Sequence, residues 1–194
     1  MNERQPPTDP HVRRAAREHV EIVPYDPGWP RLFEEERRHL RAILPPHLIG
    51  RIEHFGSTAV PGLAAKPIVD ILVEVPSLRT VRTTLAPLLQ AHGYEFFWRP
   101  SWRNENEPAY TWFIKRAADG TRSHHIHMLE PDSAEWERLS FRDYLIAHPD
   151  VAREYEALKL RVAAECGDDR LAYAKAKTAF VRRITRLARK EAGR

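Results

Sequence analysis

Apolar residues recur at helical spacing in two segments of the N-terminal half, residues 31–44 and residues 77–92. Shorter apolar runs with the composition of strands lie between and after these segments. We expect the last two runs to form a hairpin, because Asp119-Gly120 between them is a strong turn signal. The expected strands cover residues 51–55, 68–75, 94–98, 111–115 and 123–129, and a polar loop covers residues 100–108.

The pattern becomes helical throughout after residue 131. Pro149 and Gly167 interrupt it, which predicts three helices at residues 134–147, 151–166 and 169–190. This order of elements predicts an α/β (α+β) fold, in which a small mixed sheet is flanked by helices and followed by a C-terminal helical region. We expect a flexible basic N-terminal arm at residues 1–20, a sheet domain at residues 21–131, and the helical region at residues 132–194 packed on it.

Composition narrows the class of protein. A hydrophobic content of 42% and a charged content of 30% are typical of a soluble globular protein, and no apolar run is long enough to span a membrane. Cys166 stands alone and cannot form an internal disulfide, so we expect a cytoplasmic protein. The net charge of +4 favours anionic ligands such as nucleotides. No pattern of interleaved basic and aromatic residues supports a nucleic-acid partner, and the oligomeric state is not defined by the sequence.

The stretch from residue 52 to residue 75 contains the first candidate site. It has the pattern of a strand, a turn of small residues and a second, more apolar strand. Gly56 permits the close approach of a ligand, and Ser57 is a candidate N-cap of a helix whose free N–H groups suit a phosphate. Asp70 is a single acid among apolar neighbours, where a carboxylate needs a partner or a cation. The alternative is an ordinary turn and an aspartate that caps a neighbouring backbone group.

Two histidines on the strand at residues 123–129 form the second candidate. The two-residue period of a strand places His125 and His127 on one face and the apolar residues between them on the other. Two adjacent imidazoles can ligate a metal or hold a phosphate, and they share a site with Asp70 if the two strands are neighbours. The alternatives are two surface histidines, or phosphohydrolase chemistry of the histidine-triad kind, for which Leu129 occupies the place of the third histidine.

The C-terminal helices carry two pairs of a tyrosine and a lysine four residues apart, a spacing that stacks each pair on one helix face. A tyrosine ring offers a flat surface for a base, and a lysine offers a charge for a phosphate chain. Lys66, beside the central turn, can reach an anion bound there. The alternative is a solvated helix face. The pairs are Tyr155 with Lys159 and Tyr173 with Lys177.

The run from His54 to Ile71 resembles the signature of the GrpB family. Residues 141–145, 155–159 and 173–177 are similar to later motifs of that family. The resemblance extends from about residue 20 to the C-terminus.

This resemblance implies membership of the DNA polymerase beta-like nucleotidyltransferase superfamily, with the nucleotidyltransferase-like domain at residues 21–131. Its members share a Gly-Ser turn and a following strand that carries Asp-x-Asp or Asp-x-Glu. Gly56, Ser57 and Asp70 match this pattern. Leu72 stands in the place of the second acid, which puts two-metal chemistry in question.

The resemblance further implies a protein that binds a nucleotide triphosphate and Mg²⁺ and transfers a nucleotidyl group to a small acceptor. Asp70 and His127 are then the expected catalytic residues, and the expected metal ligands are Asp70, His125 and His127. The alternative is a catalytically reduced nucleotide-binding or regulatory module, which Leu72 favours. The family domain also occurs fused to dephospho-coenzyme A kinase, which points to a nucleotide partner. The residues expected to bind the nucleotide are Gly56, Ser57, Lys66, Tyr155, Lys159, Tyr173 and Lys177.

Overall fold

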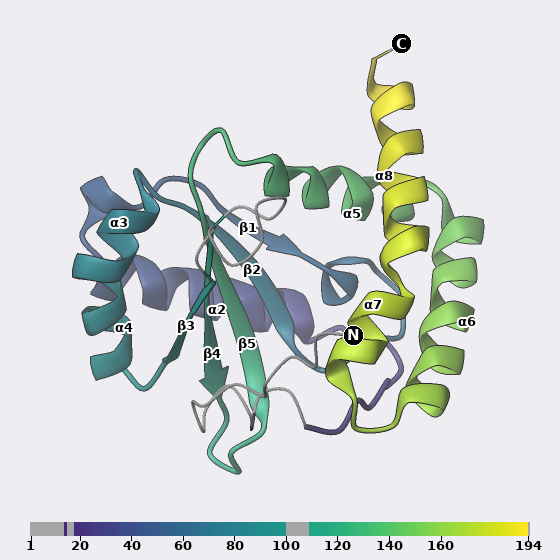
Figure 1. Cartoon of the computed structure of the whole chain (residues 1–194), viewed down its shortest axis with the longest axis horizontal. Helices are drawn as coiled ribbons and strands as arrows, with labels where there is room; N and C mark the ends of the chain where they lie inside the picture. The colour runs from purple at the N-terminus through teal and green to yellow at the C-terminus, as the bar shows by residue number, and fades with distance from the viewer. Residues whose placement is uncertain (1–13, 15–17, 100–108, 194) are drawn as a thin grey trace, which may run out of the picture.

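The computed structural model describes residues 14, 18–99 and 109–193 (Figure 1). Most of the arm predicted at residues 1–20 and the polar loop predicted at residues 100–108 lie outside the described residues. The described chain has a mixed α+β architecture, as predicted, in which helices flank a five-stranded sheet.

The sheet has the strand order β1-β2-β5-β4-β3. Strands β2 and β5 pair in parallel, and the other three pairs are antiparallel. The predicted strands are all confirmed with their ends shifted by at most one residue, and β4 and β5 form the predicted hairpin. The strands are β1 (Ile52–Phe55), β2 (Val69–Glu74), β3 (Glu95–Arg99), β4 (Tyr110–Arg116) and β5 (Arg122–Leu129), and a short 3₁₀ helix, η1 (Pro46–Leu48), precedes β1.

The pairing register gives the two faces of the sheet different characters. Asp70 of β2 lies opposite His125 of β5, and Leu72 lies opposite His127. These four side chains point to one face, because alternate residues of a strand share a face. The residues between them point to the other face and are buried in the main core.

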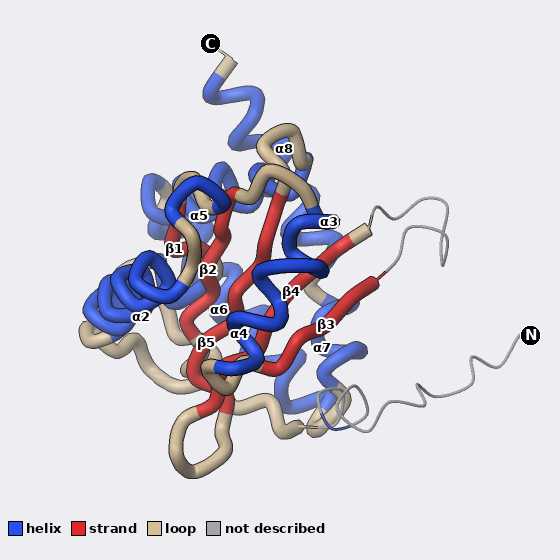
Figure 2. Tube along the Cα trace, turned by 90° about the vertical axis from the view of Figure 1, so that its left-hand side faces the viewer, coloured by secondary structure: helices blue, strands red, loops and turns tan. Residues whose placement is uncertain are grey.

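The main core lies between the apolar face and the N-terminal helices. Helix α2 (Trp29–Ile43) contacts β1 and β2, and the segment formed by α3 (Leu78–Thr80), the π-helical η3 (Val81–Leu85) and α4 (Ala86–Ala91) contacts β3 (Figure 2). The two predicted helices are therefore present, the second with a π-helical middle. Ser77 caps this second segment, because its hydroxyl accepts a hydrogen bond from the N–H of Thr80. Core residues include Phe33, Leu40, Val73, Leu85, Leu89, Phe113 and Met128.

A buried ion pair ties α2 to the sheet. Glu36 is 2% exposed and accepts hydrogen bonds from the Tyr94 hydroxyl and from Nζ of Lys115. A carboxylate without such partners would be strongly disfavoured in this core. The pair therefore fixes the position of α2 against β4.

The C-terminal region lies together on the right of Figure 1 and covers the other face. The single helix predicted at residues 169–190 is wrong, since the chain breaks at Lys177 into two helices. The break lets Tyr173 and Phe180 pack into two different apolar clusters. The region contains η5 (Ala134–Trp136), α5 (Glu137–Ala147), α6 (Pro149–Cys166), α7 (Arg170–Ala176) and α8 (Thr178–Ala192).

The turn between β1 and β2 also differs from the prediction. Gly56 precedes η2 (Ser57–Ala59), a single 3₁₀ turn, so Ser57 begins this turn instead of capping a longer helix. The predicted helix N-terminus at Ser57 is therefore wrong, and the aligned peptide dipoles of a long helix are missing here. Among the described helices, none has the length and apolar character that crossing a lipid bilayer requires.

Candidate functional site

Asp70, His125 and His127 meet on the face of the sheet that the C-terminal helices cover. Nδ1 of His125 donates a hydrogen bond to Oδ1 of Asp70 at 3.0 Å, and Nε2 of His127 lies 3.9 Å from the same oxygen. The three candidate ligand atoms lie within 4.8 Å of one another, close enough to hold one metal ion. Each imidazole is 13% exposed and Asp70 is 25% exposed. The expected pairing of the two strands is confirmed, and both imidazoles are largely withdrawn from solvent, unlike the alternative of two surface histidines.

Burial controls the protonation of this group. It lowers the pKa of His125 to about 4 and also lowers the pKa of His127, so both rings are neutral at pH 7. Burial alone would raise the pKa of the Asp70 carboxyl, but the hydrogen bond from His125 and the electrostatic interaction with His127 outweigh it and hold that pKa well below its usual value. The result is an ionised carboxylate beside two neutral imidazoles, which is the state that metal binding requires.

Two residues that the sequence did not single out support the group. The Tyr110 hydroxyl lies 2.6 Å from Nδ1 of His127, which leaves Nε2 of that ring directed at Asp70. The Arg138 guanidinium lies 5.5 Å and 5.3 Å from the ring centres of Phe55 and Tyr110. Arg138 also pairs with the acid three residues before it, so in the sequence it has the pattern of a solvated helix face.

Gly56 brings the turn against the Asp70 carboxylate. Its φ of +73° and ψ of −172° lie in a region that residues with a side chain rarely adopt. A Cβ at this position would lie 2.6 Å from Oδ2 of Asp70. Thr58 anchors the turn on the other side, through contacts of its Oγ1 with Nε2 of His54 at 3.0 Å and with the carbonyl of Ile68 at 3.4 Å. The contact between turn and carboxylate therefore requires a glycine.

A cleft of about 730 Å³ opens beside this group. Phe55 and Gly56 line one side, and residues of the C-terminal helices line the other, Tyr155 among them. Its volume is that of a typical small-molecule site. Basic side chains outnumber the acidic ones, Glu135 and Glu137, which favours an anionic ligand. The basic residues are Arg138, Lys177, Arg182, Arg186 and Arg189.

Lys177 and Lys66 both contact the ring of Tyr173. Their Nζ atoms lie 3.9 Å and 5.4 Å from the ring centre. Burial lowers the pKa of Lys177 to about 7 and that of Lys66 to about 8. Tyr173 is 1% exposed, and its hydroxyl has no hydrogen-bond partner among the described residues. The predicted contact of Tyr173 with Lys177 is present, although a helix break separates α7 from α8 there.

Tyr155 and Lys159 also contact each other, as their spacing predicts, with Nζ 5.0 Å from the ring centre. The Tyr155 hydroxyl bonds to the side chain of Ser57. Lys159 instead donates to the carbonyl of Ala64, and the carboxylate of Glu156 accepts from the N–H of Ala64 at 2.7 Å. Lys159 therefore holds the loop before β2 and does not line the cleft.

These features define an α+β protein in which a carboxylate and two imidazoles meet at a glycine turn, and Gly56 of that turn lines a cationic cleft. Residues 19–187 match the family model described as GrpB protein, and the chain belongs to the GrpB family. The crystal structure of the conserved protein GrpB from Enterococcus faecalis is similar, with a TM-score of 0.75 and 32% identity, over 90% of this chain and 100% of that one. The predicted fold class is thereby confirmed.

Three similar proteins match this chain over different fractions of their own length. UPF0157 protein PA4798 of Pseudomonas aeruginosa is 38% identical over 95% of this chain and 74% of that protein. UPF0157 protein YqkA of Bacillus subtilis is 37% identical over 84% of this chain, which spans only 45% of the relative. A protein named dephospho-CoA kinase from Mycolicibacterium paratuberculosis is 31% identical over 91% of this chain and 48% of its own length.

Proposed function

We propose that this protein binds a nucleotide triphosphate and one divalent cation in the cleft beside Asp70, by the chemistry of the DNA polymerase beta-like nucleotidyltransferases. One observation carries the proposal. Gly56 approaches the ionised Asp70, which meets the two imidazoles, and Gly56 also lines a cationic cleft of suitable size. A phosphate chain in this cleft meets backbone from the turn, a metal-binding group and basic side chains together.

The donor set determines which cations fit. One carboxylate and two imidazoles suit Mn²⁺ or Zn²⁺ better than Mg²⁺, which prefers oxygen ligands and retains several waters. A bound cation supplies positive charge that neutralises phosphate oxygens and aligns them for in-line attack. Asp70 and His127 would hold such a cation, and Tyr110 would keep the ring of His127 in the required orientation.

His125 has a second partner that affects its role. Nη1 of Arg122 donates to Nε2 of His125 at 3.3 Å, which directs the ring proton to Nδ1 and toward Asp70. His125 can therefore bind the cation only after Nδ1 loses that proton; otherwise it orients Asp70. Separate His125→Gln and His127→Gln variants distinguish a three-residue metal site from a two-residue one.

Lys177 and Tyr155 are assigned to the nucleotide. Lys177 lines the cleft with a pKa near neutrality, so a bound phosphate would draw a proton onto it and gain an ion pair. Tyr155 lines the same cleft with a buried ring that packs against Phe141 and Phe180, so it forms part of the wall of the nucleotide site. Lys159 serves by holding the loop that follows the turn.

A second candidate function is a nucleotide-binding module without transfer activity. Leu72 is fully buried against Phe55 and Leu129, so the position of the second acid is part of an apolar cluster. Transfer by two metal ions needs that acid as a shared ligand. Pyrophosphate release from triphosphates, assayed with a panel of small acceptors, favours the enzyme; tight binding without release favours the module.

The proposal is tested by titrating ATP and GTP in the presence of Mn²⁺ or Mg²⁺ by calorimetry. We expect Asp70→Ala to weaken metal-dependent binding by about 100-fold, because it removes the only carboxylate of the group. Asp132→Ala is the matched control, since Asp132 is an exposed turn residue outside the cleft. Undiminished metal-dependent binding by Asp70→Ala would remove Asp70 from the site.

A further inference from the structure

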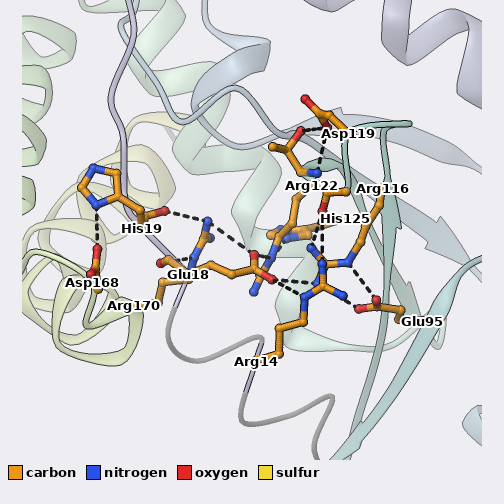
Figure 3. Close-up of polar contacts among 12 residues, drawn as sticks. Arg14, Glu18, His19, Glu95, Arg116, Asp119, Arg122, His125, Asp168 and Arg170 are labelled. Carbon is orange, nitrogen blue, oxygen red and sulfur yellow. Dashed lines mark hydrogen bonds and ion pairs between the residues drawn. The ribbon is translucent and has the colours of Figure 1, made fainter.

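A second cavity of about 370 Å³ lies on the Lys66 side of the candidate site. Figure 3 shows the polar contacts of residues that line it, among them Glu18, Arg116, Arg122 and Arg170. Among the residues that the structure describes, five basic side chains and three acidic ones line it. The basic residues come from separate elements, Arg116 from β4, Arg122 from β5 and Arg170 from α7, with Lys66 from the loop before β2. Because these residues come from separate elements of the fold, the basic cavity is a defined feature of the tertiary structure and not a row of charges along one helix face.

The Glu18 carboxylate occupies the centre of this basic group. Its Oε1 lies 2.7 Å from Nη2 of Arg116, and its Oε2 lies 2.5 Å from Nε of Arg122 and 4.0 Å from Nη2 of Arg170. Burial alone would raise the pKa of Glu18, but the hydrogen bonds and charges of Arg116 and Arg122 outweigh it and lower that pKa. Glu18 is therefore an ionised carboxylate in a shared arginine site.

The arginines are mostly withdrawn from solvent. The exposed fractions of the Arg116, Arg122 and Arg170 side chains are 13%, 7% and 13%. Burying several cations is costly unless anions accompany them. Among the described residues, five basic side chains face four carboxylates, those of Glu18, Glu21 and Asp119 in the lining and that of Glu95, which pairs with Arg116. Positive charge is therefore in surplus by one, and by two once the Glu18 carboxylate leaves. A dianion matches this surplus better than a single carboxylate does.

The cavity adjoins the candidate site directly. Arg122 bonds to His125, which in turn bonds to Asp70. Lys66 lines the cavity and contacts one ring, Tyr173, that Lys177 of the cleft also contacts. An anion in the cavity therefore lies next to the metal-binding group, separated from the cleft by Tyr173. A second ligand held here would be placed beside the first.

We propose that this cavity binds the phosphate group of a second substrate. The Glu18 carboxylate occupies the position of that phosphate, and the ligand displaces it on binding. The part concerning a second substrate rests on the proposed nucleotide function. Glu18 immediately precedes the range matched by the family model, whereas the three arginines and Lys66 lie within it. The acceptor is then a small molecule that carries a phosphate group.

The test is a calorimetric titration of the full chain with inorganic phosphate, without metal or nucleotide. Glu18→Gln removes the competing carboxylate, and we expect it to tighten phosphate binding about tenfold. Glu21→Gln is the matched control, because Glu21 lines the same cavity, is exposed and carries the same charge. We expect it to change binding by less than about twofold. Equal effects of the two variants would overturn the proposal.

Further variants locate the phosphate. Adding Arg122→Gln to Glu18→Gln should remove the gain in affinity, with Arg170→Gln in place of Arg122→Gln if that double variant does not fold. In the same Glu18→Gln background, Arg186→Gln, in the cleft, should leave the gain in phosphate affinity in place. Loss of phosphate binding in Arg186→Gln but not in the Arg122 variant would place the anion in the cleft and refute the proposal. Acetate binding as tight as that of phosphate would refute the assignment to a phosphate.

This titration is independent of the proposed nucleotide site, because it contains neither metal nor nucleotide. Asp132→Ala, outside both the cavity and the cleft, should bind phosphate like the wild type. If ATP fails to bind but Glu18→Gln still gains phosphate affinity, the anion site stands and the nucleotide function fails. If ATP binds and Glu18→Gln shows no gain, the anion site fails alone.

Discussion

Gly56→Ala should destabilise the fold strongly, because it disturbs the closest contact between the turn and Asp70. The added Cβ would lie 2.6 Å from Oδ2, 3.1 Å from Cβ and 3.2 Å from Cγ of Asp70. Real Cβ atoms do not approach other atoms this closely, so the carboxylate or the turn must move. The carboxylate is held by His125, and the turn is held by Thr58.

The magnitude follows from two costs. Alanine at φ +73° and ψ −172° costs about 1–3 kcal/mol in backbone strain. Rotation of the Asp70 carboxylate away from the new methyl breaks its hydrogen bond from His125, which is worth about 1.5–3 kcal/mol for a charged acceptor. We expect a loss of about 3–5 kcal/mol in the free energy of unfolding.

Gly62→Ala is a matched control in the same loop. Gly62 has φ +78°, but no atom lies within 4 Å of an added Cβ. Its substitution should cost only the backbone term of about 1–2 kcal/mol. Asp70→Ala provides a second control, because it removes the Oδ2 and Cγ atoms that the methyl meets. In that background the excess cost of Gly56→Ala over Gly62→Ala should shrink.

The assay is urea unfolding of the four variants, followed by far-UV circular dichroism without added metal. A Gly56→Ala variant within about 0.5 kcal/mol of Gly62→Ala would refute the close contact of turn and carboxylate. An excess cost that persists unchanged in the Asp70→Ala background would show that the strain lies in the backbone alone.

Three further predictions concern stability and pH. Tyr94→Phe should lower the free energy of unfolding by about 1.5–3 kcal/mol in the same urea assay, because the buried Glu36 carboxylate loses a donor. Burial lowers the pKa of His54 and His125 to about 4, so these rings do not reduce the stability of the fold above pH 6.5, where they are neutral in both the folded and the unfolded chain. The free energy of unfolding should fall as the pH drops from 6.5 to 4, by at most about 3 kcal/mol for each ring. Urea unfolding at pH 4.5 to 7.5 measures this change. A stability independent of pH in this window would contradict both pKa directions. If the nucleotide lies in the cleft, its affinity should weaken between pH 6 and pH 8 as Lys177, with a pKa of about 7, loses its proton, and Lys177→Met should bind more weakly with less dependence on pH.

Local sequence patterns predict the elements of this fold well. The strands emerge from short apolar runs and the hairpin from Asp119-Gly120, because these signals act over a few neighbouring residues. The order of the strands does not follow from such signals. The parallel pairing of β2 with β5 joins segments about fifty residues apart. The sequence pattern could say only that Asp70 and the histidines share a site if these two strands are neighbours.

Breaks without glycine or proline are harder to predict. The chain turns at Lys177, whose backbone keeps helical φ and ψ values of −87° and −11°, so no breaker marks the end of α7. The turn after Gly56 shows the converse, since Ser57 has the chemistry of an N-cap but begins a three-residue turn.

The candidate site was predictable in part. The two-residue period placed His125 and His127 on one face, and a lone acid on an apolar strand marked Asp70. The residue spacing could not show where the Lys159 side chain points. Its Nζ donates to the carbonyl of Ala64 and does not face the cleft. Arg138 and Tyr110 were missed because one lies in an ordinary helical charge pattern and the other in an apolar strand. The Glu18 cluster depends on contacts of about 100 residues in sequence separation, which no local pattern encodes.

The central claim is that Asp70 and the histidines hold a cation against a triphosphate in the adjacent cleft. Anomalous diffraction from crystals grown with Mn²⁺ and a non-hydrolysable ATP analogue measures this directly. The account predicts a manganese peak in bonding contact with Asp70 and His127, and phosphate density running from Gly56 toward Lys177. Manganese bound elsewhere, or a triphosphate density away from the Gly56 turn, would contradict it.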